Sequence, residues 1–406
     1  MTASPPDDGK PAVARAAMPV LLAITVISWV GFGMVAPLLP FYGALFDVPA
    51  WEVTLLFSAH SAGQFAGELY WGRLSDRIGR RPVLLMTITG MGLCFLGLAF
   101  APNIWLAVLV RMVGGFFAGN ISTVQSYVVD ISPPERVSSR LGQLGAANVV
   151  GFSSGPALGG LLANPEIGAA GFRPPLLTGA CLSFIAVICV FLLVRESFRH
   201  SPATAKKRGP FDGLVESMRH PMLRSLMGVG ILFSICFIAA WATLGLWGAP
   251  RHGWDARTLG IIMGVGGLTG AFCQAVLVGP LVRRLGAGRT IILGLAMMTV
   301  FLIAMAFAPW TWLAAAFLCL AIAGNALVIP ATATFVITVS TPERQGQNLG
   351  ASNASMALAR VGGPMIGGML FAAAPVAPFI AAALGMLPAI WLTRRAMREG
   401  VDRNPR

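Results

Sequence analysis

A single carboxylate lies well inside one of the apolar stretches of the chain. Of the 16 acidic residues, all except Glu68 fall in expected loops, tails or helix ends, with Asp130 at the margin of an apolar stretch. Burial raises the pKa of a carboxyl group, whereas a neighbouring cation lowers it. A glutamate that alternates between apolar and cationic surroundings can therefore bind a proton and release it near neutral pH. We expect Glu68 to carry such proton chemistry, with Asp130 as a second candidate.

Two polar residues share the expected helix with Glu68. His60, Gln64 and Glu68 follow one another at intervals of four residues, and the whole set drifts only about 80° around a helix with 3.6 residues per turn. They can therefore form one polar stripe. His60 is the only histidine in an apolar stretch, and because histidine ordinarily titrates near pH ~6.5 it is a candidate proton relay. A hydrogen-bonded structural histidine is an equally good interpretation.

Two arginines, Arg111 and Arg360, also lie inside apolar stretches. A charge within a hydrocarbon-length helix is costly and normally functional, so both are candidates for proton coupling. A static structural ion pair is the alternative for Arg111. Neutralisation of an anionic substrate is the alternative for Arg360.

Membrane-spanning helices must position these residues. Hydrophobic residues make up 56% of the 406-residue chain and charged residues 11%, with a mean hydropathy of +0.75, whereas soluble domains carry about 25% charged residues. A spanning helix needs about 20 mainly apolar residues. We find about twelve such stretches, near residues 17–46, 52–72, 82–100, 105–129, 141–163, 176–194, 225–249, 259–281, 290–308, 311–338, 349–373 and 376–393. The expected fold class is an all-α membrane protein with twelve transmembrane helices.

Catalytic and metal sites are not expected. The six cysteines fall within apolar stretches and form no Cys-x-x-Cys pair, which is typical of small buried apolar residues. The sequence has no His/Cys/Asp cluster, no nucleotide-binding glycine loop and no nucleophile with a partner base. We therefore expect no enzymatic activity, no metal and no cofactor.

The distribution of basic residues explains the net charge of +13. With the amino terminus placed in the cytoplasm, 24 of the 29 lysines and arginines fall in cytoplasmic segments, three fall on the other side and two lie in the membrane. The positive-inside rule therefore predicts that both termini are cytoplasmic. Because basicity here orients the helices, we expect no binding to nucleic acid. The expected location is the plasma membrane, which is the inner membrane in a bacterium.

An internal repeat divides the chain. Ser132-Pro-Pro-Glu-Arg136 returns as Ser340-Thr-Pro-Glu-Arg344, and Gly155-Pro-Ala-Leu-Gly-Gly160 returns as Gly363-Pro-Met-Ile-Gly-Gly368, both 208 residues later (340−132 and 363−155). We expect two six-helix pseudo-repeats, 1–194 and 225–406, joined by a basic cytoplasmic linker at 195–224. A substrate site between the two halves, near the bilayer midplane, is expected for such a duplication.

The segment Gly72-Arg-Leu-Ser-Asp-Arg-Ile-Gly-Arg-Arg81 resembles the loop 2–3 signature of the major facilitator superfamily, and the duplication extends the resemblance over the whole chain. The resemblance implies the major facilitator fold. It also implies that Asp76 sits against the amino end of helix 11, where unpaired N–H groups attract an anion. The arginines would pair with carboxylates at the end of helix 4. The gating residues expected in this region are Gly72, Asp76, Arg77, Gly79, Arg80, Arg81 and Glu135, with Asp130 as the other acidic partner.

A second segment, Gly151-Phe-Ser-Ser-Gly-Pro-Ala-Leu-Gly-Gly160, resembles the antiporter motif of drug:proton exporters. Its small residues let helices approach closely, and its proline removes one backbone donor and bends the helix. Ordinary small-residue packing is the alternative. The motif residues are Gly151, Gly155, Pro156, Gly159 and Gly160. Arg111 matches the position of a helix 4 arginine that the family implicates in proton transfer.

Glu68 and Arg360 are expected to approach one another. At about 1.5 Å per residue, Glu68 lies roughly 12 Å along its helix from Asp76, and Arg360 roughly 18 Å from Asn348 at the start of helix 11. If Asp76 meets that helix start, the two charges come within reach. We hypothesise a salt bridge between the halves that protonation of Glu68 releases.

The resemblance places helices 1, 4, 7 and 10 around the substrate cavity. Aromatic faces with a few amides suit bulky, partly apolar compounds. Similarity to tetracycline efflux pumps is seen in Trp254-Asp255-Ala256 and in Gln64-Phe65, although Ser28 or Trp29 stands where those pumps carry an acid on helix 1. The expected substrate-binding residues are Trp29, Phe32, Gln64, Asn120, Gln125, Trp241, Trp247 and Asn325.

Together these features predict proton-coupled efflux of drugs or metabolites by alternating access. The partners would be a small amphipathic substrate, protons and membrane lipids, with the protein acting as a monomer. The alternative is an uptake symporter or facilitator for a metabolite or organic anion, which is favoured if Arg111 and Arg360 bind the substrate.

Overall fold

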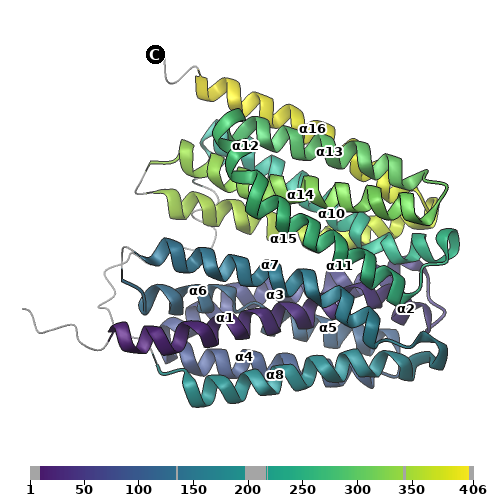
Figure 1. The fold of residues 1–406 in the computed structure, drawn as a ribbon, viewed down its shortest axis with the longest axis horizontal. Coiled ribbons are helices and arrows are strands. Elements are labelled where there is room, and N and C mark those ends of the chain that lie inside the picture. Colours follow the sequence, from purple (N-terminus) through teal and green to yellow (C-terminus); the bar gives the residue numbers. More distant parts are fainter. Residues whose placement is uncertain (1–9, 134–135, 197–215, 217, 342–343, 402–406) are drawn as a thin grey trace, which may run out of the picture.

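The computed structural model describes residues 10–133, 136–196, 216, 218–341 and 344–401, and all regular secondary structure in these ranges is helical. The long helices run side by side as a bundle (Figure 1). The helical elements in the first part of the chain are α1 (Lys10–Val35), η1 (Ala36–Leu38), α2 (Leu39–Ala44), α3 (Ala50–Ile78), α4 (Arg80–Ala99), α5 (Ile104–Ala118), α6 (Ile121–Asp130), α7 (Val137–Leu162), η3 (Pro165–Phe172) and α8 (Arg173–Leu193). In the second part they are α10 (Pro221–His252), α11 (Ala256–Phe272), η4 (Cys273–Leu277), α12 (Val278–Leu285), α13 (Ala287–Ala306), α14 (Thr311–Val339), α15 (Gln345–Ala373) and α16 (Ala377–Val401).

Ten of the helical spans in the described ranges are long and apolar enough to cross a membrane. The two remaining long helices, α3 and α7, fall outside this set although they have 29 and 26 residues. Both pack against helices of the other half, α3 on α15 and α7 on α11. Both helices carry polar and small residues along their length, among them His60, Gln64 and Glu68 on α3 and the glycines of 151–160 on α7. The predicted all-α fold class is confirmed, and the helices are compatible with twelve spans.

The helices form two bundles with equivalent packing. In the first, α1 packs on α7, α3 on α5 and α4 on α8; in the second, α10 packs on α15, α11 on α14 and α13 on α16 (Figure 1). The start of α1 and the end of α16 lie at the same end of the molecule (Figure 1). We call this the termini end. Most of the segment 195–224 lies outside the described residues, so the domain boundaries stay a prediction.

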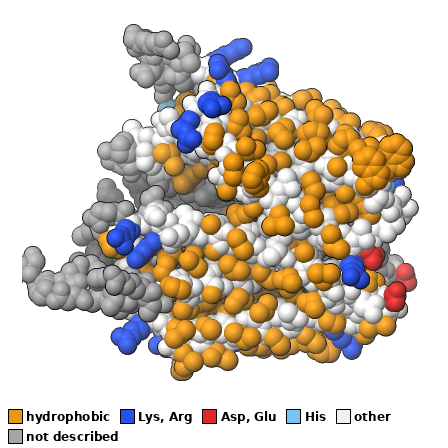
Figure 2. Space-filling view, viewed as in Figure 1, with side chains coloured by type: hydrophobic (Ala, Val, Ile, Leu, Met, Phe, Trp, Pro, Cys, Tyr) orange, Lys and Arg blue, Asp and Glu red, His pale blue; other side chains and the backbone are white. Residues whose placement is uncertain are grey.

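The surface of the molecule fits an apolar solvent. In the space-filling view, hydrophobic side chains cover the middle of the visible face, and lysines and arginines gather toward the two ends (Figure 2). Many large apolar side chains are exposed, among them Phe191, Leu268 and Trp312. This distribution is expected where lipid replaces water around the bundle.

Three expected spans are interrupted, the first of them, 17–46, by the 3₁₀ turn η1. The span expected at 105–129 is broken between α5 and α6, at Gly119 and Asn120, where Asn120 Nδ2 donates a hydrogen bond to Thr87 Oγ1 at 2.8 Å. A Cβ at position 119 would collide with the backbone of Gly67 and Glu68 on α3. Close approach to α3 therefore requires a glycine here, and glycine weakens the helix. The span expected at 259–281 contains the single π-helical turn η4.

The signature segment 72–81 is mostly helical. The helix α3 continues to Ile78, and Gly79 alone makes the turn, with φ of 103° that favours glycine. The helix α4 then begins at Arg80, and the carboxylate of Glu196 accepts hydrogen bonds from the backbone N–H groups of Arg80 at 2.9 Å and Arg81 at 3.1 Å. An anion at a helix start is favourable because the N–H groups there lack partners. Sequence analysis did not identify Glu196.

The glycines of 151–160 bring three helices together. A Cβ at Gly155 would lie 2.7 Å from the Cα of Gly33 on α1, and one at Gly159 would meet the carbonyl oxygen of Met34. Gly160 faces the other half, where its Cβ would lie 2.7 Å from the carbonyl oxygen of Ala256 on α11. The motif therefore packs α7 against α1 and also joins the two halves.

We predict that Gly159→Ala lowers the melting temperature of the purified protein, because the added methyl group has no space beside Met34. Overpacking of this kind costs about 1–3 kcal/mol. Gly142→Ala on the same helix is the matched control, since a Cβ there meets no atom within 4 Å. Equal melting temperatures for the two variants in a thermal unfolding assay would contradict the packing account.

Candidate functional site

A large cavity lies between the two halves, with a volume of about 530 Å³. Helices α1, α3, α4, α5, α6, α7 and α8 line it from the first half, and α10, α14 and α15 line it from the second. Its lining combines apolar and aromatic side chains with 14 polar or charged ones, which suits organic molecules that have both apolar and polar parts.

The cavity is closed at the end away from the termini. Besides the Gly160 contact, a Cβ at Gly245 on α10 would lie 2.9 Å from Pro40, and one at Gly368 on α15 would lie 2.8 Å from the Cα of Trp51. Toward the termini end, Gly350 in the second turn of α15 still lines the cavity, and a Cβ there would meet no atom within 4 Å. Among the described residues, the halves therefore touch at one end, whereas at the other end Gly350 faces open space.

Three charged side chains line the cavity: Glu68 on α3, Arg111 on α5 and Arg360 on α15. Glu68 and Arg360 come from opposite halves and attract one another electrostatically. Their charged groups do not form an ion pair within 4.0 Å; the salt bridges found in the described part of the chain lie elsewhere. In this conformation Glu68 and Arg360 line the cavity from opposite halves, but the expected salt bridge between them is not formed.

Arg111 and His60 line both the central cavity and a small void beside it. The side chain of Arg111 is buried, and its Nε donates a long hydrogen bond of 3.4 Å to the carbonyl oxygen of Leu56. His60 is also buried, and its Nδ1 has no hydrogen-bond partner within the described ranges. A Cβ at Gly115 would collide with the backbone of His60, so α3 and α5 are in direct contact here. A role in proton transfer and a purely structural role both stay predictions for His60 and for Arg111.

Aromatic rings form a continuous series across the cavity wall. Phe32 lies 5.2 Å from His60 and 6.2 Å from Phe152, measured between ring centroids. Phe152 stacks at 5.9 Å on Trp241 of the other half, which lies 5.5 Å from Phe237. Such a surface can bind flat or bulky apolar groups through dispersion and ring stacking. We call these five residues the aromatic series.

Six of the eight residues expected to bind substrate line the cavity, namely Trp29, Phe32, Gln64, Asn120, Gln125 and Trp241. Trp247 and Asn325 do not. Trp247 is buried inside the second half, where its ring lies 5.6 Å from that of Trp254 and 5.3 Å from that of Phe379. Asn325 lies on α14 with its Oδ1 buried and without a partner in the described chain. A helix position alone did not reveal which face of α10 or α14 points to the cavity.

The signature residues form a cluster at the termini end. Arg80 pairs with Asp76 on one side and, through its Nε at 3.2 Å, with Asp130 at the end of α6 on the other. The Asp76 side chain is 63% exposed and has no partner on α15 in the described ranges. Among the described residues no ion pair joins Asp76 to the start of α15, and the expected contact stays a prediction. Glu135 lies outside the described residues.

Sequence analysis missed several cavity residues, including Phe152, Phe237 and Asn353. Phe152 occupies a variable position of the glycine motif, and the motif pattern therefore gives this residue no role. Phe237 lies four residues before Trp241, and Asn353 seven before Arg360, which places each on the same helix face as its partner. This spacing was the available signal.

Comparison with known sequences identifies the family. A sequence model of the Major Facilitator Superfamily matches residues 21–364 and 274–405. The chain belongs to the major facilitator superfamily. It is 28% identical over 364 residues to the class C tetracycline resistance protein of Escherichia coli, covering 88% of this chain and 90% of the relative. It is 27% identical over 368 residues to the multidrug resistance protein MdtG of Salmonella arizonae, covering 85% and 88%.

Solved structures share the fold. The human organic anion transporter MFSD10 (TETRAN) matches with a TM-score of 0.70 and 20% identity, covering 96% of this chain and all of that one. A bacterial homologue of the human lysosomal transporter Spinster, in an inward-facing and occupied conformation, matches with a TM-score of 0.77 and 15% identity, covering 94% and 96%. The protein is therefore a multi-pass membrane transporter and not an enzyme, and its relatives match the predicted tetracycline-efflux-like branch of drug:proton antiporters.

We predict that Trp241→Leu weakens binding of the planar dye rhodamine 6G by roughly 2- to 12-fold, because an aromatic pair contributes about 0.5–1.5 kcal/mol beyond its buried area. Its melting temperature should change little. Trp247→Leu is the control: it lies in the packed interior, so it should lower the melting temperature more than the affinity. The reverse pattern, in fluorescence titration and thermal unfolding, would remove the aromatic series from the binding site.

Proposed function

We propose that the protein exports small amphipathic compounds in exchange for protons, by alternating access of the central cavity. The observation that carries this proposal is the placement of Glu68 and Arg360 on opposite halves, both lining the cavity and not joined in an ion pair. A titratable carboxylate facing a cation of the moving partner can link protonation to movement.

The proposed cycle follows from the charge of Glu68. When its carboxylate is ionised, attraction to Arg360 favours approach of α3 and α15, which already pack together. Protonation removes the negative charge and with it this attraction. Approach at the termini end would also bring the exposed Asp76 toward the first turn of α15, where unpaired N–H groups can bind it. The proton on Glu68 therefore shifts the balance between two arrangements of the halves.

Orientation gives the cycle its direction. With both termini in the cytoplasm, the end at which Gly350 faces open space lies toward the cytoplasm, and a compound can enter the cavity from there. The aromatic series provides its binding surface. The expected halves, 1–194 and 225–406 joined by 195–224, would rock about the glycine contacts near Gly160 and Gly368. We propose a location in the plasma membrane, the inner membrane of a bacterium, and function as a monomer.

A second candidate is an uptake symporter or facilitator for a metabolite or organic anion. Two arginines and one glutamate line the cavity, so an anion would find one more cation than carboxylate there. In this case Arg111 and Arg360 would bind the substrate. Export remains the first candidate because the chain is similar to tetracycline and multidrug resistance proteins.

We predict that Glu68→Gln abolishes proton-driven accumulation of rhodamine 6G in proteoliposomes, to the level of protein-free vesicles, because glutamine cannot bind and release a proton. Exchange of dye without a proton gradient should persist. Glu52→Gln is the matched control: it removes a carboxylate from the first turn of the same helix and should keep proton-driven accumulation.

Undiminished proton-driven accumulation by Glu68→Gln would refute the coupling role. If the wild-type protein transports organic anions by counterflow, independently of protons, and does not accumulate the dye, the second candidate replaces the first.

A further inference from the structure

Each half of the protein contains a small void beside the central cavity, and the two voids are related by the internal repeat. In the first half the void is lined by Met91, Phe95 and Leu98 on α4 and by Val110 on α5, among others. In the second half, Met298, Leu302 and Met305 on α13 and Leu318 on α14 take the equivalent places. The offsets of 207 and 208 residues (298−91 and 318−110) match the sequence repeat. The duplicated fold thus produced the same void twice.

The two voids have diverged in chemistry. Arg111, His60 and Cys94 contribute to the lining of the first. The second is lined only by Phe, Ala, Trp, Leu, Met and Ile side chains, which belong to α10, α13, α14 and α16. One void is therefore lined by a buried charge, whereas the other can receive only an apolar group.

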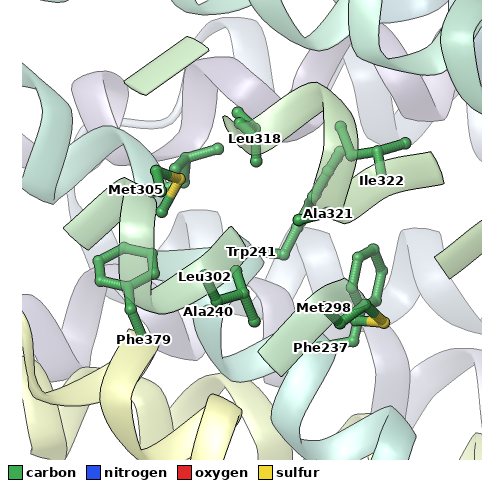
Figure 3. Close-up of a pocket in the computed structure, with 11 residues that line it drawn as sticks. Phe237, Ala240, Trp241, Met298, Leu302, Met305, Leu318, Ala321, Ile322 and Phe379 are labelled. Atoms are coloured by element: carbon green, nitrogen blue, oxygen red, sulfur yellow. The ribbon is translucent and has the colours of Figure 1, made fainter. Parts of the chain in front are cut away.

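Two residues separate the second void from the central cavity. Phe237 and Trp241 line both spaces, and both belong to the aromatic series. Figure 3 shows the other lining side chains around the void, with Met298, Met305, Leu318 and Phe379 on its borders. A compound stacked on the aromatic series would lie directly against this wall.

We propose that the void behind Phe237 and Trp241 is a side subsite that takes an apolar alkyl or aryl substituent of the transported molecule. The proposal rests on the export function proposed above, since it assigns part of the same substrate to this space. The molecule would keep its polar part in the central cavity and place its apolar substituent between α10, α13 and α14.

The apolar lining of the void supports such a role, and its adaptable side chains would have to move apart to admit a substituent. Its volume of about 20 Å³ would hold one water, but an apolar space of this kind stays dry because water finds no hydrogen-bond partners there. Methionine side chains adapt to irregular ligands, and Met298 and Met305 both face the void, so it can widen. Each methylene that enters it should increase affinity by about fourfold, as expected for transfer from water to an apolar site.

Cysteine labelling tests access to the void without requiring transport. In a variant with the native cysteines replaced, Ala321→Cys would be treated with methyl and butyl methanethiosulfonates. Ala323→Cys is the matched control: both alanines lie on α14 and are 4% exposed, but Ala323 packs beside Cys273 and Ala326, away from the void. We expect butyl labelling of Ala321→Cys to be at least roughly tenfold faster than that of Ala323→Cys. Equal rates would overturn the proposal.

A transport measurement tests whether the substrate uses the void. Ala321→Phe more than fills the void, whose volume is about 20 Å³, and Leu320→Phe, on the exposed neighbouring position, is the control. With methyl and hexyl esters of rhodamine B as probes, Ala321→Phe should lower the ratio of hexyl to methyl export at least roughly fivefold, and Leu320→Phe should leave the ratio unchanged. An unchanged ratio in Ala321→Phe overturns the role in substrate binding. Absence of dye export by the wild-type protein instead refutes the proposed function, and the labelling result then still decides access.

Discussion

The attraction between a carboxylate and a guanidinium across a cavity is the interaction on which this account depends. Glu68 and Arg360 lie on helices of opposite halves that pack together, yet no ion pair joins them. The strength of such an attraction changes greatly with the water between the charges, because it is weak in a high dielectric and strong in a low one. Opening or drying the cavity therefore changes the attraction between Glu68 and Arg360. Adding or removing one proton changes the same attraction.

Close helix packing makes this contact possible. Glycines on α3 and α5 leave no space for side chains between the two helices, so Glu68 and Arg111 are held beside the same cavity. Gly160 and Gly368 occupy equivalent positions of the repeat, and each faces a helix of the opposite half. The halves thus meet through backbone rather than through long side chains. Such contacts give a firm closure at one end of the cavity.

The fold was largely predictable from sequence, but the faces of the helices were not. Hydropathy, the distribution of arginines and the 208-residue repeat were sufficient to predict an all-helical bundle in the major facilitator superfamily. They did not show that the signature segment continues α3 as far as Ile78, because only Gly79 departs from helical geometry. Nor did they separate Trp241, which lines the cavity, from Trp247, which is buried. Packing between helices decides which side of a helix points into the cavity. The sequence of one helix alone does not contain this information.

The most direct measurement is infrared difference spectroscopy of the purified protein, following the C=O stretch of protonated carboxyl groups as substrate is added. We expect a change in this band for the wild-type protein, its loss in Glu68→Gln and its persistence in Glu52→Gln. A band change that is the same in Glu68→Gln and in the wild type would show that another group carries the proton, and would contradict the central claim.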